Sequence, residues 1–416
     1  MSSSEGGNAG QRTDWFRDAR FGLFVHWGLY ALLGRAEWAM SRECIPPGEY
    51  AELAERFDAS GYRPREWAAM ARDAGMRYAV LTAKHHEGFC LWESKACCFH
   101  AGNSAAKRDL FGEYVEAFRD AGLKVGVYYS LGDWMNPDWR LGFSGGPGAD
   151  AARERFVGWT HAMVEELMTG YGTLDLLFYD LPQNYSAWQW RMVELNARVR
   201  ARQPGILINN RGMTTEDYAT PEQHAVASPP GRLWETCMTL NDNWGYVPTD
   251  RNFKDPRQVV LTLAQIAEGG GNLLLNVGPD GAGRIPEESS RILRGVGRWL
   301  RAHGEAVYGS ERHGMSWNLF GPCTVKGNDL YLHLFRWFGP EQAVGGLTGR
   351  VIDAVCLSDG RPLEVEQQGD RAVIRGLPED PPDPLMPVVR LTLDRPPAQD
   401  FTDQLGTADV FPVFPA

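Results

Sequence analysis

The chain has 416 residues, a length that suits one large domain followed by a smaller one. Hydrophobic residues make up 43% of it, which excludes wholesale disorder, and the formal net charge of −11 without a basic cluster excludes a typical nucleic-acid-binding protein. We therefore expect a folded protein with an uncharged partner. Most of the 15 tryptophans are expected in the core, although flat indole faces also suit stacking on sugar rings.

Cysteine usage and the N-terminal composition bear on the compartment. The chain has 7 cysteines, an odd number, and no C-x-x-C pair, which favours free thiols in a reducing compartment. Residues 1–11 are polar and rich in Ser and Gly, without the apolar segment of a signal peptide. No apolar run reaches the ~18 residues of a membrane span. We expect a cytoplasmic protein with a flexible N-terminal tail over residues 1–12 and no membrane partner.

Short apolar runs alternate with helix-like segments through most of the chain. The apolar runs are residues 21–25, 78–82, 124–129, 174–179, 206–208, 233–234 and 273–277. The helix-like segments are residues 64–74, 110–121, 151–171, 187–202, 256–268 and 286–304. This alternation is typical of parallel βα units, and seven apolar runs predict a (β/α)8-like barrel, with a doubly wound sheet as the alternative. An eighth strand is not evident, so the prediction includes an irregular barrel.

Polar side chains directly follow several of the expected strands. His26, the pair His85-His86, Asp180 and Arg211 each come at or just after the end of an apolar run. Active sites of (β/α)8 barrels are built at the carboxyl ends of the strands. The positions of these polar side chains at the strand ends therefore favour the barrel over the doubly wound sheet.

The last quarter of the chain has a different pattern. Residues 329–335, 351–357, 371–374 and 388–393 are β-rich runs separated by turn residues. They predict a small antiparallel β-sandwich. We expect the catalytic barrel at residues 13–312, the sandwich at 313–400, and a C-terminal tail at 401–416. No residue of the sandwich is expected to be catalytic.

Three carboxylates are candidates for catalysis. Asp180 closes a buried strand, so its side chain is either a helix N-cap or a nucleophile or base at the barrel mouth. Glu222 lies in a loop after the fifth apolar run, and Glu235 ends the sixth. Either glutamate could complete a glycosidase pair with Asp180, and spacing alone does not choose between them. A structural hydrogen-bonding role is the alternative for each glutamate.

The histidines could bind a metal or hold hydroxyl groups. Adjacent side chains of a strand point to opposite faces, which disfavours His85 and His86 as ligands of one ion. No H-x-H or H-x-x-x-H spacing is present, so we expect no metal and assign the imidazoles to hydroxyl binding. Arg211 would orient a carboxylate or lower its pKa. Glu37, Trp38 and Tyr128 add an acceptor and stacking faces.

With these residues assembled, the chain resembles the alpha-L-fucosidases of glycoside hydrolase family 29 over about residues 13–310. The motifs that carry the resemblance are FGLFVHWG (21–28), EWAM (37–40), KHHEGF (84–89), GVYYSLGDW (126–134), LLFYD (176–180), NNRG (209–212), TPEQ (220–223), WETCMTLNDNWGY (234–246) and GGNLLLNVGP (270–279). TPEQ and WETCMTLNDNWGY are similar to the branch that prefers alpha-1,3/1,4-linked fucose. Two positions depart from the family pattern. Glu87 stands where Asp is usual, and Met135-Asn136 stand where relatives often carry His.

The resemblance implies a function and roles for the candidate residues. It implies a retaining exo-glycosidase that removes terminal alpha-L-fucosyl residues from oligosaccharides or glycoconjugates by double displacement without a cofactor. Asp180 matches the nucleophile and Glu222 the acid/base, with Glu235 as the alternative acid/base. The positions that hold fucose match His26, Glu37, Trp38, His85, His86, Tyr128 and Arg211.

Three other functions remain open at the level of sequence. A glycosidase for a fucose-like sugar, such as an alpha-L-galactoside, would use the same residues. An inactive carbohydrate-binding barrel is disfavoured because Asp180 and a glutamate candidate are both retained. A metal-dependent hydrolase would use the histidine pair together with Asp180.

Overall fold

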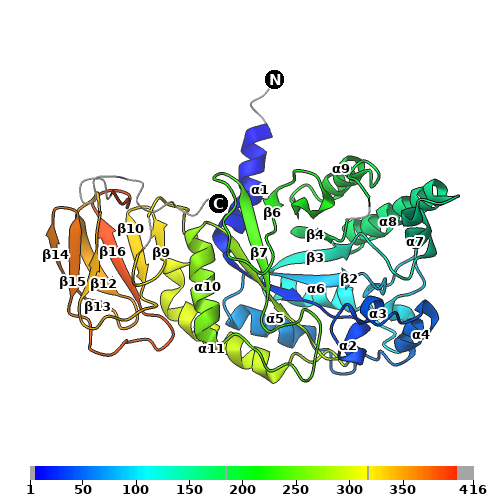
Figure 1. Ribbon diagram of the computed structural model, residues 1–416, viewed down its shortest axis with the longest axis horizontal. Coiled ribbons are helices and arrows are strands. Elements are labelled where there is room, and N and C mark those ends of the chain that lie inside the picture. The colour runs from blue at the N-terminus through cyan, green and yellow to red at the C-terminus, as the bar shows by residue number, and fades with distance from the viewer. Residues whose placement is uncertain (1–4, 183–184, 316–317, 401–416) are drawn as a thin grey trace.

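The structure is a computed structural model that describes residues 5–182, 185–315 and 318–400. It comprises an α/β barrel and an antiparallel β unit, with α10 and α11 between them (Figure 1). The expected C-terminal tail, residues 401–416, lies outside the described residues. Among those described, no helix is both long and apolar enough to cross a membrane.

Eight parallel strands form the barrel. They are β1 (Phe21–Val25), β2 (Tyr78–Lys84), β3 (Lys124–Ser130), β4 (Leu176–Asp180), β5 (Leu207–Ile208), β6 (Tyr218–Ala219), β7 (Leu233–Thr239) and β8 (Asn272–Val277). Their order is β5-β4-β3-β2-β1-β8-β7-β6, and a parallel bridge between Asn209 and Tyr218 brings β5 and β6 together. The (β/α)8-like barrel is therefore confirmed.

The strand that sequence did not reveal is β6, which has two residues. It is held beside β5 by Asp217, whose N–H donates to the Ile208 carbonyl at 3.0 Å and whose Oδ2 accepts from the Ile208 N–H at 2.8 Å. Within residues 209–232, all of them described, η3 (Asn210–Gly212), a 3₁₀ turn, is the only helical segment. The barrel is irregular on this side.

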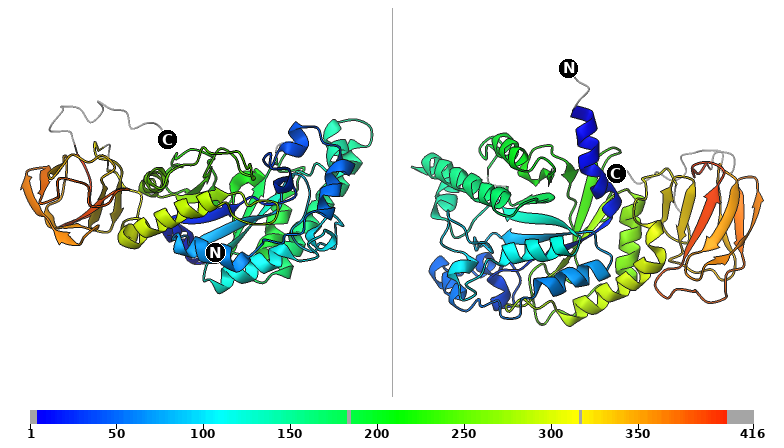
Figure 2. Two further views of the ribbon diagram at one scale, coloured as in Figure 1. Left: turned by 90° about the horizontal axis from the view of Figure 1, so that it is seen from below. Right: turned by 180° about the vertical axis from the view of Figure 1, so that it is seen from behind.

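Helices cover the outside of the barrel (Figure 2). The α-helices are α1 (Glu5–Ala19), α2 (Tyr30–Leu33), α3 (Ala39–Arg42), α4 (Pro47–Ala51), α5 (Pro64–Asp73), α6 (Leu110–Asp120), α7 (Pro137–Ser144), α8 (Ala149–Gly170), α9 (Met192–Arg202), α10 (Pro256–Glu268) and α11 (Glu287–His303). The other 3₁₀ turns are η1 (Glu52–Glu55), η2 (Ala101–Asn103) and η4 (Gly304–Ala306). Helix α10 begins with a capping box in which Asp255 and Gln258 satisfy each other's backbone N–H groups.

The N-terminal expectation needs a correction. Residues 5–12 were expected in a flexible tail but belong to helix α1, while residues 1–4 lie outside the description. The reason is tertiary. Phe16 is buried and packs on Tyr218 with ring centroids 4.9 Å apart, and its carbonyl accepts from Asn272 Nδ2 at 2.8 Å. This anchor against the barrel lets a helix extend through a stretch of weak helix formers.

The barrel interior determines which polar side chains reach the mouth. Phe24, Tyr128 and Phe178 are buried inside the barrel, in one cluster. Because side chains of a strand alternate between its faces, the residues two positions further on share the inward face. Following Phe24 and Phe178, those residues are His26 and Asp180. The aromatic layer thus forms the floor beneath the polar groups.

The C-terminal unit consists of two antiparallel sheets, which confirms the predicted β-sandwich. Its strands are β9 (Cys323–Lys326), β10 (Asp329–His333), β11 (Gln342–Val344), β12 (Val351–Cys356), β13 (Arg361–Pro362), β14 (Glu364–Gln368), β15 (Arg371–Arg375) and β16 (Val388–Leu393). The sheets have the orders β13-β12-β16-β10-β9 and β11-β15-β14. The sandwich packs on α10 and α11, where Trp299 Nε1 donates to the Met386 carbonyl at 2.7 Å and Arg257 stacks on Phe335.

Candidate active site

Asp180 is the last residue of β4, and its carboxylate is held from two sides. Tyr128 donates its hydroxyl to Oδ2 at 2.8 Å, and Arg211 donates from Nη1 to Oδ1 at 2.9 Å. Burial acts to raise the pKa of Asp180, but Arg211, His86 and these hydrogen bonds outweigh burial and bring it below its ordinary value. The side chain keeps 20% exposure. It is an ionised carboxylate open to the barrel mouth.

Arg211 joins Asp180 to a second carboxylate. It lies in the turn η3, where Thr220 fixes its Nε through a hydrogen bond of 2.9 Å. Its Nη2 donates to Glu222 Oε2 at 2.7 Å, while Nη1 binds Asp180. The planar fork of one guanidinium therefore contacts both acids. The Glu222 side chain is 41% exposed and lies just after β6, in a bridge with Cys237.

Glu235 lies elsewhere in the barrel. Its side chain is fully buried, and its Oε2 accepts a hydrogen bond from the hydroxyl of Tyr78, the first residue of β2. Its other oxygen has no partner among the described residues. Burial raises the pKa of Glu235 to about 8. Glu235 is thus a neutral acid inside the barrel at the pH of most assays, whereas Glu222 is the glutamate that shares a cation with Asp180.

We expect Glu235→Gln to leave turnover and its dependence on leaving group unchanged and to alter stability. In the wild type the unfolded chain releases the Glu235 proton near its ordinary pKa, whereas the folded protein retains it up to pH about 8. The free energy of unfolding therefore contains a contribution that falls as pH rises between those values. The amide of Glu235→Gln lacks this contribution. The free energy of unfolding of the variant, measured with urea, should therefore rise relative to that of wild type as pH increases. If the free energy of unfolding depended on pH in the same way in both proteins, Glu235 would not be a buried neutral acid.

Three histidines lie together at the mouth. The rings of His85 and His86 are 3.9 Å apart and those of His26 and His85 are 5.5 Å apart, between centroids. The expectation that His85 and His86 point to opposite faces is wrong, because β2 ends at Lys84 and the chain no longer alternates there. His86 Nδ1 lies 2.8 Å from Ser130 Oγ, and its Nε2 lies 3.9 Å from Asp180 Oδ2.

These imidazoles are neutral. Burial lowers the pKa of His26 to about 3 and that of His86 to about 4, although the Asp180 charge opposes the shift in both. Burial also brings the pKa of His85 well below its ordinary value. Neutral imidazoles offer one donor and one acceptor each, which suits hydroxyl groups. Among the described residues, no group of three or more His, Cys, Asp or Glu could hold a metal ion.

Glu37 and Trp38 complete the rim from the segment before α3. Glu37 is buried and accepts the Gly245 N–H at 2.8 Å. Burial raises the pKa of Glu37, and the nearby Glu222 charge adds to the effect. The Trp38 ring lies 5.2 Å from that of His86 and 5.0 Å from that of Trp134, between centroids. All the site residues expected from sequence except Glu235 are thus gathered around Asp180, although their individual roles remain predictions.

Sequence reasoning missed the residues that orient this set. Asn276 Oδ1 lies 2.7 Å from His26 Nδ1, and its Nδ2 donates to the Trp244 carbonyl at 2.7 Å. Thr220 and Ser130 orient Arg211 and His86. The available signal was a polar residue inside an apolar run, as in LLLNV at residues 273–277.

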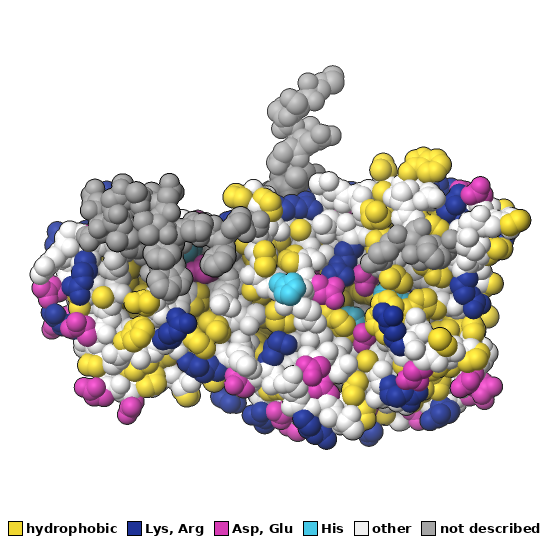
Figure 3. All heavy atoms as spheres, viewed as in Figure 1, with side chains coloured by type: hydrophobic (Ala, Val, Ile, Leu, Met, Phe, Trp, Pro, Cys, Tyr) yellow, Lys and Arg dark blue, Asp and Glu magenta, His cyan; other side chains and the backbone are white. Residues whose placement is uncertain are grey.

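Figure 3 shows acidic, basic and histidine side chains next to one another on the face of the barrel turned to the viewer.

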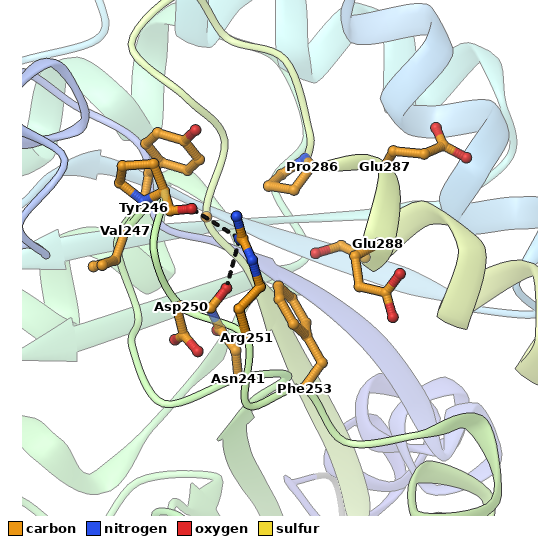
Figure 4. A pocket seen from close by; sticks show the side chains of 12 residues that line it. Asn241, Tyr246, Val247, Asp250, Arg251, Phe253, Pro286, Glu287 and Glu288 are labelled. Atoms are coloured by element: carbon orange, nitrogen blue, oxygen red, sulfur yellow. Dashed lines mark hydrogen bonds between the residues drawn. The ribbon is translucent and has the colours of Figure 1, made fainter.

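A hollow of about 210 Å³ lies beside these residues and not among them. The loop after β7 and the first turn of α11 line it, and Arg251 reaches into it (Figure 4). Arg251 Nη1 donates to the carbonyls of Pro248 and Asp250 at 2.8 and 3.1 Å. The same loop carries Gly245, which binds Glu37, so the hollow adjoins the site through one segment.

The chain is similar to known proteins in both sequence and structure. The family described as alpha-L-fucosidase matches residues 3–305. The tissue alpha-L-fucosidase of Rattus norvegicus is 33% identical over 376 residues, covering 80% of this chain and 78% of that protein. Alpha-L-fucosidase isoenzyme 1 of Paenibacillus thiaminolyticus is 40% identical with a TM-score of 0.87, covering 93% of this chain and 100% of that one. A family 29 alpha-L-fucosidase of Bacteroides thetaiotaomicron, trapped in a mutant as a covalent intermediate with 2-fluoro-fucosyl fluoride, is 28% identical with a TM-score of 0.82, covering 92% and 96%.

Proposed function

The chain belongs to the alpha-L-fucosidase family, and on that premise we propose that Asp180 is the nucleophile and Glu222 the acid/base of its retaining hydrolysis of terminal alpha-L-fucosides. The observation that carries the assignment is Arg211, which holds both carboxylates with one guanidinium. A retaining enzyme needs its two carboxyl groups close together, at about 5–5.5 Å. A turnover assay with an aryl alpha-L-fucoside tests the activity, and the anomeric configuration of the first product, followed by NMR, tests retention.

In the first step Asp180 attacks the anomeric carbon of the bound fucosyl group. Arg211 and Tyr128 keep its carboxylate ionised and fix its orientation, which is what a nucleophile requires. Glu222 protonates the leaving oxygen, so its carboxyl group has to leave Arg211 and reach the glycosidic oxygen. Its partial exposure leaves room for that movement.

In the second step water releases fucose from Asp180. Glu222, now ionised, takes a proton from the water as it attacks the anomeric carbon, and the Asp180 carboxylate is regenerated. The three neutral histidines and Glu37 hold the sugar through its hydroxyl groups, and Trp38 holds it through its ring face. The aromatic floor beneath Asp180 suits the methyl group of fucose.

Replacing Arg211 should affect the pH profile as well as the rate. In Arg211→Met the pKa of Asp180 loses its main opposing charge and rises, so the acid limb of kcat/KM moves to higher pH. We expect a loss of about 10²-fold near neutral pH, with a smaller loss and shift in Arg211→Lys, which keeps the charge but not the fork. Arg65→Met is the matched control, because Arg65 also contacts two acids but on the exposed surface of α5. If the acid limb of kcat/KM did not move in Arg211→Met, Arg211 would not be the residue that lowers the pKa of Asp180.

We also propose that the substrates carry alpha-1,3- or alpha-1,4-linked fucose on branched glycans. The support is the TPEQ motif that contains Glu222 and the loop after β7, both similar to the branch with that preference. Isomeric fucosylated oligosaccharides, assayed with purified protein, test it. Faster hydrolysis of alpha-1,2- or alpha-1,6-linked isomers would contradict it. An aryl alpha-L-galactoside in the same assay tests the fucose-like alternative, and full activity in a chelator would exclude the metal-dependent hydrolase.

The cysteines support a reducing compartment. All seven are free thiols in the structure, three of them at least partly accessible. We therefore propose a cytoplasmic location, in keeping with the rarity of disulfides there.

A further inference from the structure

A buried carboxyl group, that of Glu87, lies beside His85 and has no role in the mechanism above. The side chains of Glu87 and His85 are 1% and 3% exposed, and Glu87 Oε2 lies 3.9 Å from His85 Nδ1. Both atoms are buried, and neither has a hydrogen-bond partner among the described residues. Buried polar atoms without partners are rare and costly, so two of them facing each other call for a physical explanation.

The position of the His85 ring is fixed by its packing. Tyr128 stacks on it with centroids 5.7 Å apart and planes 13° apart, and His86 lies 3.9 Å away. Tyr30 contacts it edge-on at 5.4 Å. Packing therefore fixes the plane of the ring, and the nitrogen that carries the proton decides whether Nε2 donates or accepts a hydrogen bond.

Glu87 is enclosed and is not neutralised by the neighbouring ammonium. Lys84 Nζ donates to the carbonyls of Ser130 and Gly132 at 2.9 and 3.2 Å and pairs with Asp133 at 3.4 Å. On the other side Glu87 abuts Gly28, where an added Cβ would lie 2.9 Å from Oε1. Burial raises the pKa of Glu87 to about 8, with Lys84 opposing the shift and Asp133 adding to it. Glu87 is therefore a neutral acid at neutral pH.

We propose that Glu87 is a positioning residue that donates Oε2–H to Nδ1 of His85 and thereby keeps the imidazole proton on Nε2, where it is donated to a hydroxyl of the sugar. One hydrogen bond then satisfies both orphaned atoms. The approach from 3.9 Å to about 2.8 Å needs only a small adjustment of the Glu87 side chain. The inference rests on the proposed function, because it assumes that His85 binds fucose.

The proposal has a consequence for pH. Once Glu87 ionises it can only accept, so the His85 proton moves to Nδ1 and Nε2 loses its hydrogen. The other groups that face Glu87 are Lys84 and Asp133, which pair with each other, and the phenols of Tyr30 and Tyr50, whose pKa values burial raises well above the ordinary value. Sugar binding should accordingly be strongest below pH about 8 and weaken as pH rises through it.

The experiment is a titration of L-fucose by calorimetry at several pH values from mildly acidic to alkaline. For wild type we expect the dissociation constant to rise about tenfold across the ionisation of Glu87, the scale of one lost hydrogen bond. Glu87→Gln can donate its amide N–H to Nδ1 at every pH, so it should bind fucose as tightly as wild type in acid and show no alkaline weakening. Glu268→Gln is the matched control, because Glu268 is a remote buried acid whose pKa burial raises to about 7. It should keep the wild-type profile.

The proposal would be overturned if fucose binding by Glu87→Gln weakened with pH at the same midpoint as in wild type. It would also be overturned if fucose binding by wild type did not depend on pH. In both cases fucose binding itself, and so the proposed function, would stand. No fucose binding and no turnover of an aryl fucoside at any pH would overturn both. If Glu87→Gln does not fold, the ¹⁵N spectrum of wild-type histidines decides, with His85 assigned by its loss in His85→Asn. A proton on Nε2 at neutral pH that moves to Nδ1 in alkali supports the proposal, and a proton on Nδ1 at neutral pH overturns it.

Discussion

Asp180→Ala is expected to lower kcat for an aryl alpha-L-fucoside by about 10⁴-fold or more, while the affinity for fucose changes little. The loss is large because the variant has no group to form the covalent bond, and nucleophile removals in other hydrolases have effects of this size. Binding persists because the histidines, Glu37 and Trp38 hold the sugar in its place. Kinetics with the aryl fucoside and calorimetry with fucose measure the two effects.

Azide should restore part of the activity of Asp180→Ala. The space left by the carboxylate lies on the face from which Asp180 attacks, so the anion should enter there and yield fucosyl azide of inverted configuration. Arg211 would still face the space, with Glu222 as its remaining carboxylate partner. Asp180→Asn is the control, since its amide fills the space and should resist rescue. Near-wild-type turnover by Asp180→Ala would refute the assignment of the nucleophile.

Glu222→Ala should discriminate between substrates by their leaving groups. General acid catalysis contributes about 10²- to 10⁴-fold, and it matters most when the leaving group is poor. We expect natural oligosaccharides to lose activity in that range, and an activated aryl or fluoride fucoside to lose little in the first step. The second step then lacks its base, so added azide should accelerate it and give fucosyl azide of retained configuration. Product analysis by NMR measures this directly.

Glu235→Ala provides the comparison for Glu222→Ala. Its loss leaves the Tyr78 hydroxyl without its acceptor, at a cost of about 1–3 kcal/mol in stability. It should show no dependence on leaving group. If Glu235→Ala showed that dependence and Glu222→Ala did not, the two glutamates would exchange roles, with Asp180 unaffected.

Much of the fold and the positions of the candidate site residues could be predicted from sequence. β1, β2, β3 and β8 were readable because parallel barrel strands are buried on both faces and so appear as continuous apolar runs. Asp180 was readable for the same reason, since a carboxylate that closes such a run must lie at the mouth or be paired. The two-residue strand β6 and the helical residues 5–12 were missed, because both depend on anchoring against the barrel wall.

The barrel, the sandwich and a set of polar residues at the strand ends are predictable from the sequence, because they follow from local hydrophobic pattern and chain order. Spacing alone left Glu222 and Glu235 open and the family resemblance favoured Glu222, whereas the tertiary structure shows which of the two shares a guanidinium with Asp180. Both follow short apolar segments, but Arg211 reaches Glu222 through the turn η3, whereas Glu235 meets Tyr78, which is 157 residues away in the chain. It also set His26 against Asn276, 250 residues away. Such contacts depend on strand register and barrel closure, which no local pattern encodes.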